Sequence, residues 1–226
     1  MEVFPNLHWI ETRAANVYLY VEADGLTLVD TANPGQEETI LGYVETVGRK
    51  RDELKHILIT HADWDHAGSA AAIQSQTGAT VYAGTQTAAL LQQGKMPQHL
   101  PRPVQFILDR FIGYPPLPAT AIQTVAEGDT LPIVAELQVL ATPGHSSDHH
   151  SFYSPTAGVL FAGDALSTRG GELKLSPGLV TGDGDVARIS GRRLLALAPA
   201  LFACGHGAPL QDHTLRDVMT ALQSLK

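Results

Sequence analysis

The run His61-Ala62-Asp63-Trp64-Asp65-His66 constrains the fold of this sequence more than any other feature. It follows the apolar residues 57–60, which are predicted to form a strand, and it places two imidazoles and two carboxylates close together. Both side-chain types bind divalent first-row metal ions, and a loop after a rigid strand can direct several of them inward. Carboxylates held this close repel each other unless a cation offsets their charge. The run therefore predicts a metal site.

A simpler alternative for this run is helix capping. Gly68 and the alanine-rich residues 69–73 are predicted to form a helix, which Asp63 or Asp65 could cap while both histidines stay solvated. One aspartate could have that role, but capping does not account for all four side chains. We therefore favour metal binding for the run as a whole.

Composition and charge limit the partners and the compartment. The 226 residues are 44% hydrophobic, which is enough to bury the core of one domain spanning residues 1–226. The net charge of -8, with 15 Lys and Arg, argues against nucleic-acid binding. No apolar run approaches the roughly 20 residues of a membrane span, and the start lacks the features of a signal peptide. We expect a cytoplasmic monomer or homodimer that acts on a small molecule and binds neither nucleic acid nor membrane.

Both halves of the sequence repeat strands followed by helices. In the first half, strands are predicted at 16–21, 26–29 and 80–82, with a helix at 36–47. In the second half, strands are predicted at 131–134, 136–140, 151–153, 159–162 and 200–203, and helices at 187–197 and 214–225. The last helix is expected to face the core with Leu215, Val218, Met219 and Leu222. This order favours an α/β fold, a four-layer αββα sandwich of two mixed β-sheets flanked by helices.

Residues 85–123 interrupt this alternation. Segments 85–93 and 104–111 have helical patterns, but several prolines divide the stretch into short pieces. Long connections in compact domains are often functional, so a helical insertion or lid over the site is one interpretation. The alternative is a surface elaboration with no contact to substrate.

Three more side chains with metal-binding chemistry follow predicted strands through a glycine. His145 lies in Thr142-Pro143-Gly144-His145, Asp164 follows Gly163, and His206 lies between Gly205 and Gly207. Glycine lets the backbone turn sharply and approach an ion without a side chain in the way. A single histidine after a strand is more often a hydrogen-bonded structural residue. Together with residues 61–66, however, the three positions indicate one convergent site.

These segments, in this order and over most of the chain, resemble the metallo-β-lactamase superfamily. The resemblance implies an αββα sandwich with a dinuclear metal centre between its two halves. It assigns the first metal to His61, Asp63 and His145, the second to Asp65, His66 and His206, and the bridge between them to Asp164.

The sequence departs from the family at one position. Residues 61–66 form an HxDxDH variant of the usual HxHxDH motif, so Asp63 stands where the family has histidine. A carboxylate weakens the preference for zinc, so iron or manganese becomes more competitive with two zinc ions. Flavodiiron proteins of the same superfamily also have an acid there, which leaves a diiron redox enzyme open. Asp63 could also stand back and leave the first site weak or empty.

Several residues are expected to support the ligands or the substrate. Three residues are predicted to orient metal ligands. Thr60 and Asp30 end strands beside the motif, and family members often have a supporting histidine near position 149, where this sequence has His149. Trp64 and Tyr114 are candidates for the substrate pocket, although Trp64 could equally pack in the core. Cys204 is expected to be a buried packing residue.

The resemblance and the ligand chemistry predict a metal-dependent hydrolase. Two ions that share a water can lower its pKa from 15.7 toward roughly 7, so that hydroxide is available to attack. Asp65 is expected to orient the nucleophile or pass a proton, and Asp164 to bridge the ions. Small esters, lactones or thioesters are the first expectation for the substrate. A β-lactam hydrolase and a non-catalytic metal-binding domain are the remaining alternatives.

Overall fold

Two mixed β-sheets form the centre of the computed structural model, which describes residues 1–211 and 215–224. The first sheet has the order β1 to β7: Glu2–Phe4, Leu7–Ile10, Val17–Val21, Leu26–Val29, Leu54–Ile59, Thr80–Gly84 and Ile122–Val125. The second has the order β12-β11-β10-β9-β8, whose strands from β8 to β12 are Thr130–Leu131, Leu137–Ala141, His150–Ser154, Val159–Gly163 and Leu201–Cys204. Each sheet combines parallel and antiparallel neighbours.

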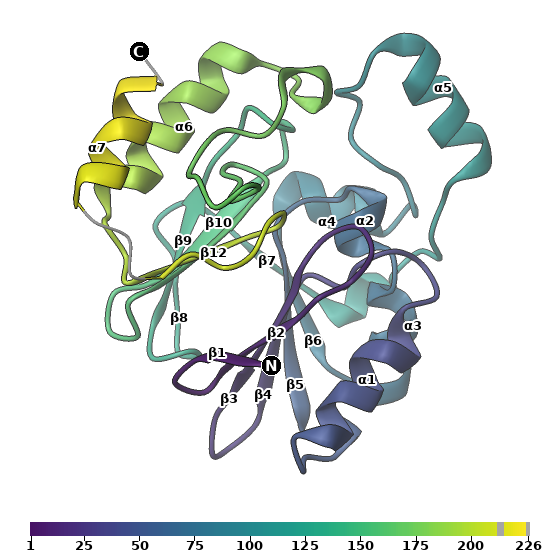
Figure 1. Cartoon of the computed structure of the whole chain (residues 1–226). Coiled ribbons are helices and arrows are strands. Elements are labelled where there is room, and N and C mark those ends of the chain that lie inside the picture. Colours follow the sequence, from purple (N-terminus) through teal and green to yellow (C-terminus); the bar gives the residue numbers. More distant parts are fainter. Residues whose placement is uncertain (212–214, 225–226) are drawn as a thin grey trace.

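Helices cover the outer face of each sheet, as Figure 1 shows. The first sheet carries α1 (Glu37–Thr46), α3 (Ala70–Thr77) and α4 (Thr85–Leu91), and the second carries α6 (Gly184–Ala196) and α7 (Leu215–Ser224). The remaining elements are the short helix α2 (Trp64–Ala67), α5 (Arg102–Phe111) and the 3-10 turns η1 (Arg51–Glu53), η2 (Ala119–Ala121) and η3 (Gly178–Val180). The predicted four-layer αββα sandwich is confirmed.

Strand periodicity explains why the sandwich has three separate cores. Successive side chains of a strand point to opposite faces of the sheet. In β5, Ile57 and Ile59 pack outward against the helices of the first sheet, whereas Leu58 packs inward against the second sheet. A third cluster joins the outer face of the second sheet to α6 and α7. Both sheets are therefore apolar on two faces, which is why several of their strands are continuous apolar runs.

The strand ends converge at one edge of the sandwich. β4, β5, β6 and β7 are parallel to one another, and so are β11 and β12. Backbone hydrogen bonds join the two sheets at this edge, from the His150 N–H to the Thr60 carbonyl (2.8 Å) and from the Asn16 N–H to the Gly205 carbonyl (2.7 Å). The segments that leave these strands therefore meet in one place.

Some predicted boundaries are wrong. The strand expected at 131–134 ends at Leu131, because Val134 and the two residues after it have positive φ angles that no strand accommodates. Short strands β1, β2 and β7 were not predicted. Met219, expected in the core, is 49% exposed, whereas Val218 is buried. The predicted ends of the last helix, Thr214 and Leu225, lie outside the described residues, as do the side chains of Leu215 and Leu222.

Only part of the predicted insertion stands apart from the sandwich. α4 belongs to the crossover between β6 and β7 and buries Ala88 and Leu91 in the first core. By contrast, α5 projects beyond the sheets (Figure 1), and its Phe106 and Phe111 side chains are exposed. No helix in the described ranges combines the length and the apolarity that crossing a membrane requires.

Candidate metal centre

Three imidazoles surround the carboxylate of Asp63. Its Oδ2 atom lies 3.3 Å from the Nε2 atoms of His61, His99 and His145. Asp63 directly precedes α2, yet its side chain makes no capping hydrogen bond within the described chain. The capping alternative is therefore wrong for Asp63, whose carboxylate faces the histidines.

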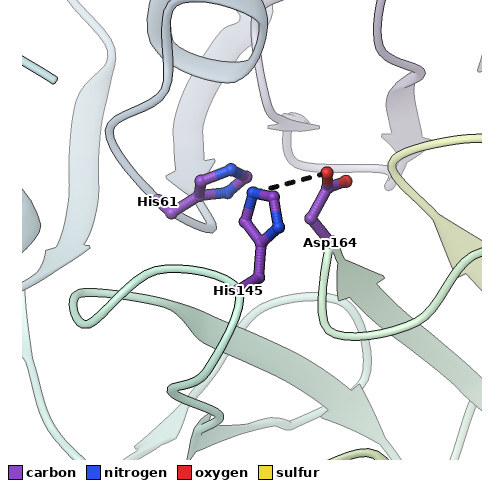
Figure 2. Close-up of side chains that lie close together, drawn as sticks. All are labelled: His61, His145 and Asp164. Atoms are coloured by element: carbon purple, nitrogen blue, oxygen red, sulfur yellow. Dashed lines mark ion pairs between the residues drawn. The ribbon is translucent and has the colours of Figure 1, made fainter. Parts of the chain in front are cut away.

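Asp164 lies between the two groups of predicted ligands. Its Oδ2 atom is 3.6 Å from Nε2 of His145 and 3.2 Å from Nε2 of His206, and its Oδ1 atom is 3.3 Å from Nε2 of His66. Figure 2 shows His61, His145 and Asp164 converging from three separate segments. A carboxylate placed in this way has the position that a bridging ligand requires.

All seven predicted ligands lie in one cluster, which also contains His99. Their ligand atoms form three groups in which every atom is within 4.8 Å of the others: His61 with His145 and Asp164, Asp63 with His99 and His145, and Asp65 with His66 and His206. Asp65 is the most exposed of the carboxylates, and its Oδ2 atom lies 3.7 Å from Nε2 of His206. The seven residues are thus brought together, and their role as ligands stays a prediction.

Buried polar atoms in the cluster fit a metal centre. Nε2 of His61 and of His66, together with Oδ1 of Asp63 and of Asp164, form no hydrogen bond with any described residue. Each such atom costs about 1–3 kcal/mol when it is buried without a partner. Imidazole nitrogens and carboxylate oxygens are suitable ligands for divalent first-row metals, so bound cations would satisfy all four atoms at once.

Asp30 fixes the orientation of two of these histidines. Its Oδ2 atom lies 2.8 Å from Nδ1 of His66 and 2.9 Å from Oγ1 of Thr60. The Thr60 hydroxyl donates to Asp30 and can therefore accept from Nδ1 of His61, 3.0 Å away. Both imidazoles then carry their proton on Nδ1 and present the free Nε2 to the centre. The predicted roles of Asp30 and Thr60 agree with these contacts.

His149 contacts the backbone of a ligand rather than the centre. Its Nε2 atom accepts from the Asp164 N–H (2.9 Å), and its Nδ1 atom lies 2.8 Å from Oγ1 of Thr142. Burial, reinforced by the nearby His61 and His145, holds the pKa of His149 well below its usual value and keeps the ring neutral. With both nitrogens engaged, His149 does not face the centre, and its role in orienting a ligand stays a prediction.

Asp148 joins the two halves of the chain behind the site. Its Oδ2 atom accepts from the Ala62 N–H (2.9 Å) and from the Thr87 hydroxyl (3.0 Å), and its Oδ1 atom accepts from the Ser146 hydroxyl. The loop that carries residues 61–66 is thereby fixed to the turn that carries His145. None of these three contacts is to a histidine side chain.

The charges of the cluster are strongly coupled. Burial alone would raise the pKa of Asp63, but the hydrogen bonds and charges of His145 and His61 outweigh it and hold this pKa well below its usual range. The pKa of Asp164 is lowered in the same way, despite its burial, by His66 and His145. Conversely, burial would lower the pKa of His66, but Asp164 and Asp30 raise it. Without cations, protons on the imidazoles must offset the carboxylates.

Two glycines are required by close packing at the centre. A Cβ atom on Gly205 would lie 2.4 Å from Oδ1 of Asp164 and 2.5 Å from Cε1 of His66. Gly163 has a φ of +50°, and a Cβ atom there would lie 2.6 Å from Nε2 of His149. The pattern of strand, glycine and ligand thus reflects how closely the backbone approaches the side chains of the site.

The cluster forms one end of a cavity of about 570 Å³. The cavity walls are mainly apolar and come from residues 100–108 and 177–180, with Trp64 beside the motif. Arg169 contributes a positive charge to the lining. Nδ1 of the neighbouring His206 lies 3.0 Å from the Ala14 carbonyl and 3.0 Å from the Arg169 guanidinium, and its Nε2 lies 3.2 Å from Oδ2 of Asp164.

The two predicted pocket residues differ in their positions. Trp64 lines the cavity and also packs against the first core, so both roles expected for it are present. Tyr114 is not among the described residues that line the cavity, and its side chain is buried. Its hydroxyl lies 2.8 Å from the Ala62 carbonyl and 2.7 Å from the Lys95 carbonyl. It supports the backbone behind the motif, which differs from the expected contact with substrate.

His99 is the residue that the sequence did not reveal. It lies between prolines 97 and 101 and follows no predicted strand or glycine, so the pattern that identified the other ligands does not apply. The sequence offered one indirect indication. The motif has Asp63 where the family pattern has a histidine, so one imidazole is missing from residues 61–66.

Comparisons with known proteins agree with this geometry. Residues 10–206 match the family described as the metallo-beta-lactamase superfamily. The "Probable metallo-hydrolase YflN" of Bacillus subtilis (strain 168) is 27% identical over 241 residues, covering 98% of this chain and 91% of that protein. A hydroxyacylglutathione hydrolase of Idiomarina loihiensis is 29% identical over 165 residues, covering 73% of this chain but only 52% of that protein.

A solved structure shows the same arrangement of sheets and helices. BJP-1, a subclass B3 metallo-β-lactamase of Bradyrhizobium japonicum, superimposes with a TM-score of 0.73 at 26% identity. The match covers 100% of this chain and 89% of BJP-1. The fold therefore has a direct structural precedent.

Proposed function

Because the chain belongs to the metallo-β-lactamase superfamily, we propose that this metallo-hydrolase cleaves small esters, lactones or thioesters with apolar substituents. The observation that carries the proposal is the cavity, whose walls are apolar and whose inner end is the His/Asp cluster. An acyl group can bury its apolar part against these walls while its carbonyl carbon reaches the cluster. Arg169 would attract a substrate that also carries a negative charge.

The ligand roles combine the family resemblance with the observed groups. His61, Asp63 and His145 would hold the first ion by the resemblance, Asp65, His66 and His206 form one observed group and would hold the second, and Asp164 would contact both. When bound, the two ions supply Lewis acidity that lowers the pKa of a shared water and polarises the substrate carbonyl. The metal identity is left open by these residues, because Asp63 makes iron or manganese competitive with zinc.

The side chains around the ions would carry out the proton transfers. Asp65 lines the cavity with a side chain that is 18% exposed, so its carboxylate can take a proton from the attacking water. It can then return the proton to the leaving alcohol or thiol. Asp30 and Thr60 meanwhile keep the Nδ1 protons of His66 and His61 in fixed positions, which prevents these rings from turning.

Two of the similar proteins suggest which substrate classes to test. The hydroxyacylglutathione hydrolase is named for a thioester, and it supports thioesters as one candidate class. BJP-1 is a β-lactamase, so β-lactam hydrolysis is a second candidate function that the shared fold favours. The match covers 52% of the hydroxyacylglutathione hydrolase. Any substrate contacts made by the rest of that protein therefore have no matched residues in this chain.

A redox function is a further candidate, and the observation that favours it is the carboxylate of Asp63. Oxygen ligands stabilise iron relative to zinc. A diiron centre would give the purified protein iron in stoichiometric amount and a visible absorption spectrum.

The decisive experiment is metal analysis followed by a substrate panel. Protein purified without added metal is analysed for zinc, iron and manganese, and is then assayed on p-nitrophenyl esters, a homologous series of lactones, acyl thioesters and a β-lactam. We expect two metal equivalents and the highest kcat/KM on an ester, lactone or thioester. Metal-loaded protein that turns over none of these classes would contradict the proposal and favour a non-catalytic metal-binding domain.

A further inference from the structure

We propose that His99 is a metal ligand and that it replaces the imidazole missing from residue 63. The inference rests on the proposed metal centre and adds a ligand from a different segment of the chain. Nε2 of His99 lies 3.3 Å from Oδ2 of Asp63, and both residues form a group with His145 whose ligand atoms are within 4.8 Å of one another. The first ion would therefore be bound by residues of the motif and of the insertion.

The side chain of His99 is directed into the site although it has no hydrogen bond there. It is 3% exposed, and its Nε2 atom forms no hydrogen bond with any residue of the described ranges. Oδ2 of Asp63 is already approached at the same distance by His61 and His145. A third imidazole in this position gains little as a hydrogen-bond donor. It gains a partner when a cation lies between the ring nitrogens and the carboxylate.

The neighbouring structure holds the backbone of His99 in place. Oε1 of Gln105, on α5, accepts from the N–H groups of His99 (3.3 Å) and Leu100 (3.2 Å). On the opposite side, a Cβ atom added to Gly182 would lie 3.0 Å from Cβ of His99. The position is therefore held between α5 and Gly182, whose N–H also donates to the His145 carbonyl (2.9 Å). These contacts hold the backbone of His99, and neither of them involves its ring nitrogens.

The inference also gives α5 a role. Gln105 joins His99 to the helix, and residues on the same helix line the cavity. Binding of the first ion would then tie the substrate-facing wall to the metal centre. A bound ion thus organises the cavity as well as the chemistry.

The test counts imidazole ligands directly. Full-length wild type, His99→Gln and His8→Gln are each loaded with Co²⁺. The paramagnetic ion shifts the exchangeable N–H resonances of the imidazoles that bind it, and proton NMR counts these resonances. His8 is a control because it lies in β2 and contacts Tyr43, away from the cluster. We expect His99→Gln to lose one shifted resonance and His8→Gln to lose none. In competition with a chelator, one of the two Zn²⁺ equivalents should bind at least about tenfold more weakly to His99→Gln.

The outcomes separate this inference from the proposed function. Wild-type protein that binds neither Co²⁺ nor Zn²⁺ would remove the metal centre itself. Two tightly bound equivalents and an unchanged number of shifted resonances in His99→Gln would overturn the role of His99 and leave the hydrolase proposal standing. If this variant does not fold, amide hydrogen exchange of the wild type decides. Zn²⁺ should then slow exchange at residues 98–105, and equal exchange with and without Zn²⁺ would contradict the inference.

Discussion

The two sides of the metal centre are held in different ways. On the side of the sheets, His61 and His66 are fixed by the buried Asp30 and Thr60 at the ends of β4 and β5. On the side of the insertion, His99 is held through its backbone by Gln105 on a helix that projects from the sandwich. The first arrangement belongs to the folded core and the second to its periphery. The comparison implies that one half of the site is preformed, whereas the other depends on the metal.

The largest expected effect is on the carboxylate that lies between the two groups of predicted ligands. Asp164→Ala removes the carboxylate between His66, His145 and His206 and should lower kcat by at least about a hundredfold to a thousandfold. Metal analysis should show fewer than two equivalents. Asp24→Asn, in an exposed turn, is the control and should retain full activity. Wild-type turnover by Asp164→Ala would exclude the proposed mechanism.

Asp30→Asn should separate the sheet side from the insertion side. The substitution removes the charge that accepts from Thr60 and His66, so the free energy of unfolding of the metal-free protein should fall by about 2–3 kcal/mol in urea titrations. Zn²⁺ affinity should also fall, by about ten- to a hundredfold. His99→Gln, in contrast, should lower Zn²⁺ affinity and leave the metal-free stability within about 0.5 kcal/mol of wild type. Equal losses of stability in both variants would contradict the comparison.

Metal removal should loosen the insertion before the sheets. Arg110 is exposed on α5 and offers a trypsin cleavage site, whereas Arg51 is paired with Glu38 and Glu45 near the first sheet. We expect chelation to speed cleavage in α5 by roughly tenfold through increased local opening and to leave cleavage at Arg51 unchanged. The measurement is mass spectrometry of timed digests. Identical digests with and without Zn²⁺ would show that the insertion does not respond to metal.

The smallest effect is a pH dependence of the metal-free protein. Asp164 and the other carboxylates raise the pKa of His66 and of His145, although burial opposes this shift. The protonated rings therefore contribute to the stability of the metal-free protein, and this contribution is fully present below about pH 6.5. This contribution is lost as pH rises through the raised values. Urea unfolding of metal-free protein should therefore give a lower free energy at pH 8.5 than at pH 6.5. Zn²⁺-loaded protein should show the opposite trend, because metal binding requires neutral imidazoles.

The sequence could predict the fold and most of the site because both follow local patterns. The same local pattern recurs at Gly144, Gly163 and Gly205: an apolar strand, then the glycine, then a predicted ligand. Each occurrence is contained in a few residues. The αββα arrangement followed from the order of strands and helices.

The remaining features depend on contacts between distant segments. His99 has no local signal, because its position is set by Gln105 and by the packing of Gly182. Tyr114 is directed away from the cavity by carbonyl groups at residues 62 and 95, which no pattern around residue 114 reveals. The strand expected at 131–134 was cut short by positive φ angles, which sequence patterning did not anticipate.

The order of the ligands along the chain also has a consequence for synthesis. The strands of the first sheet end at Val125, so a nascent chain of that length can already pair Asp30 with Thr60 and His66. His145, Asp164 and His206 emerge only later from the ribosome, at about 5–20 residues per second. For several seconds the growing protein therefore has an oriented half-site with His61, Asp63, Asp65 and His66, and the full ligand set is present only once the second sheet has been made. The bridging position of Asp164 is thus the part of the site that a shorter nascent chain cannot supply.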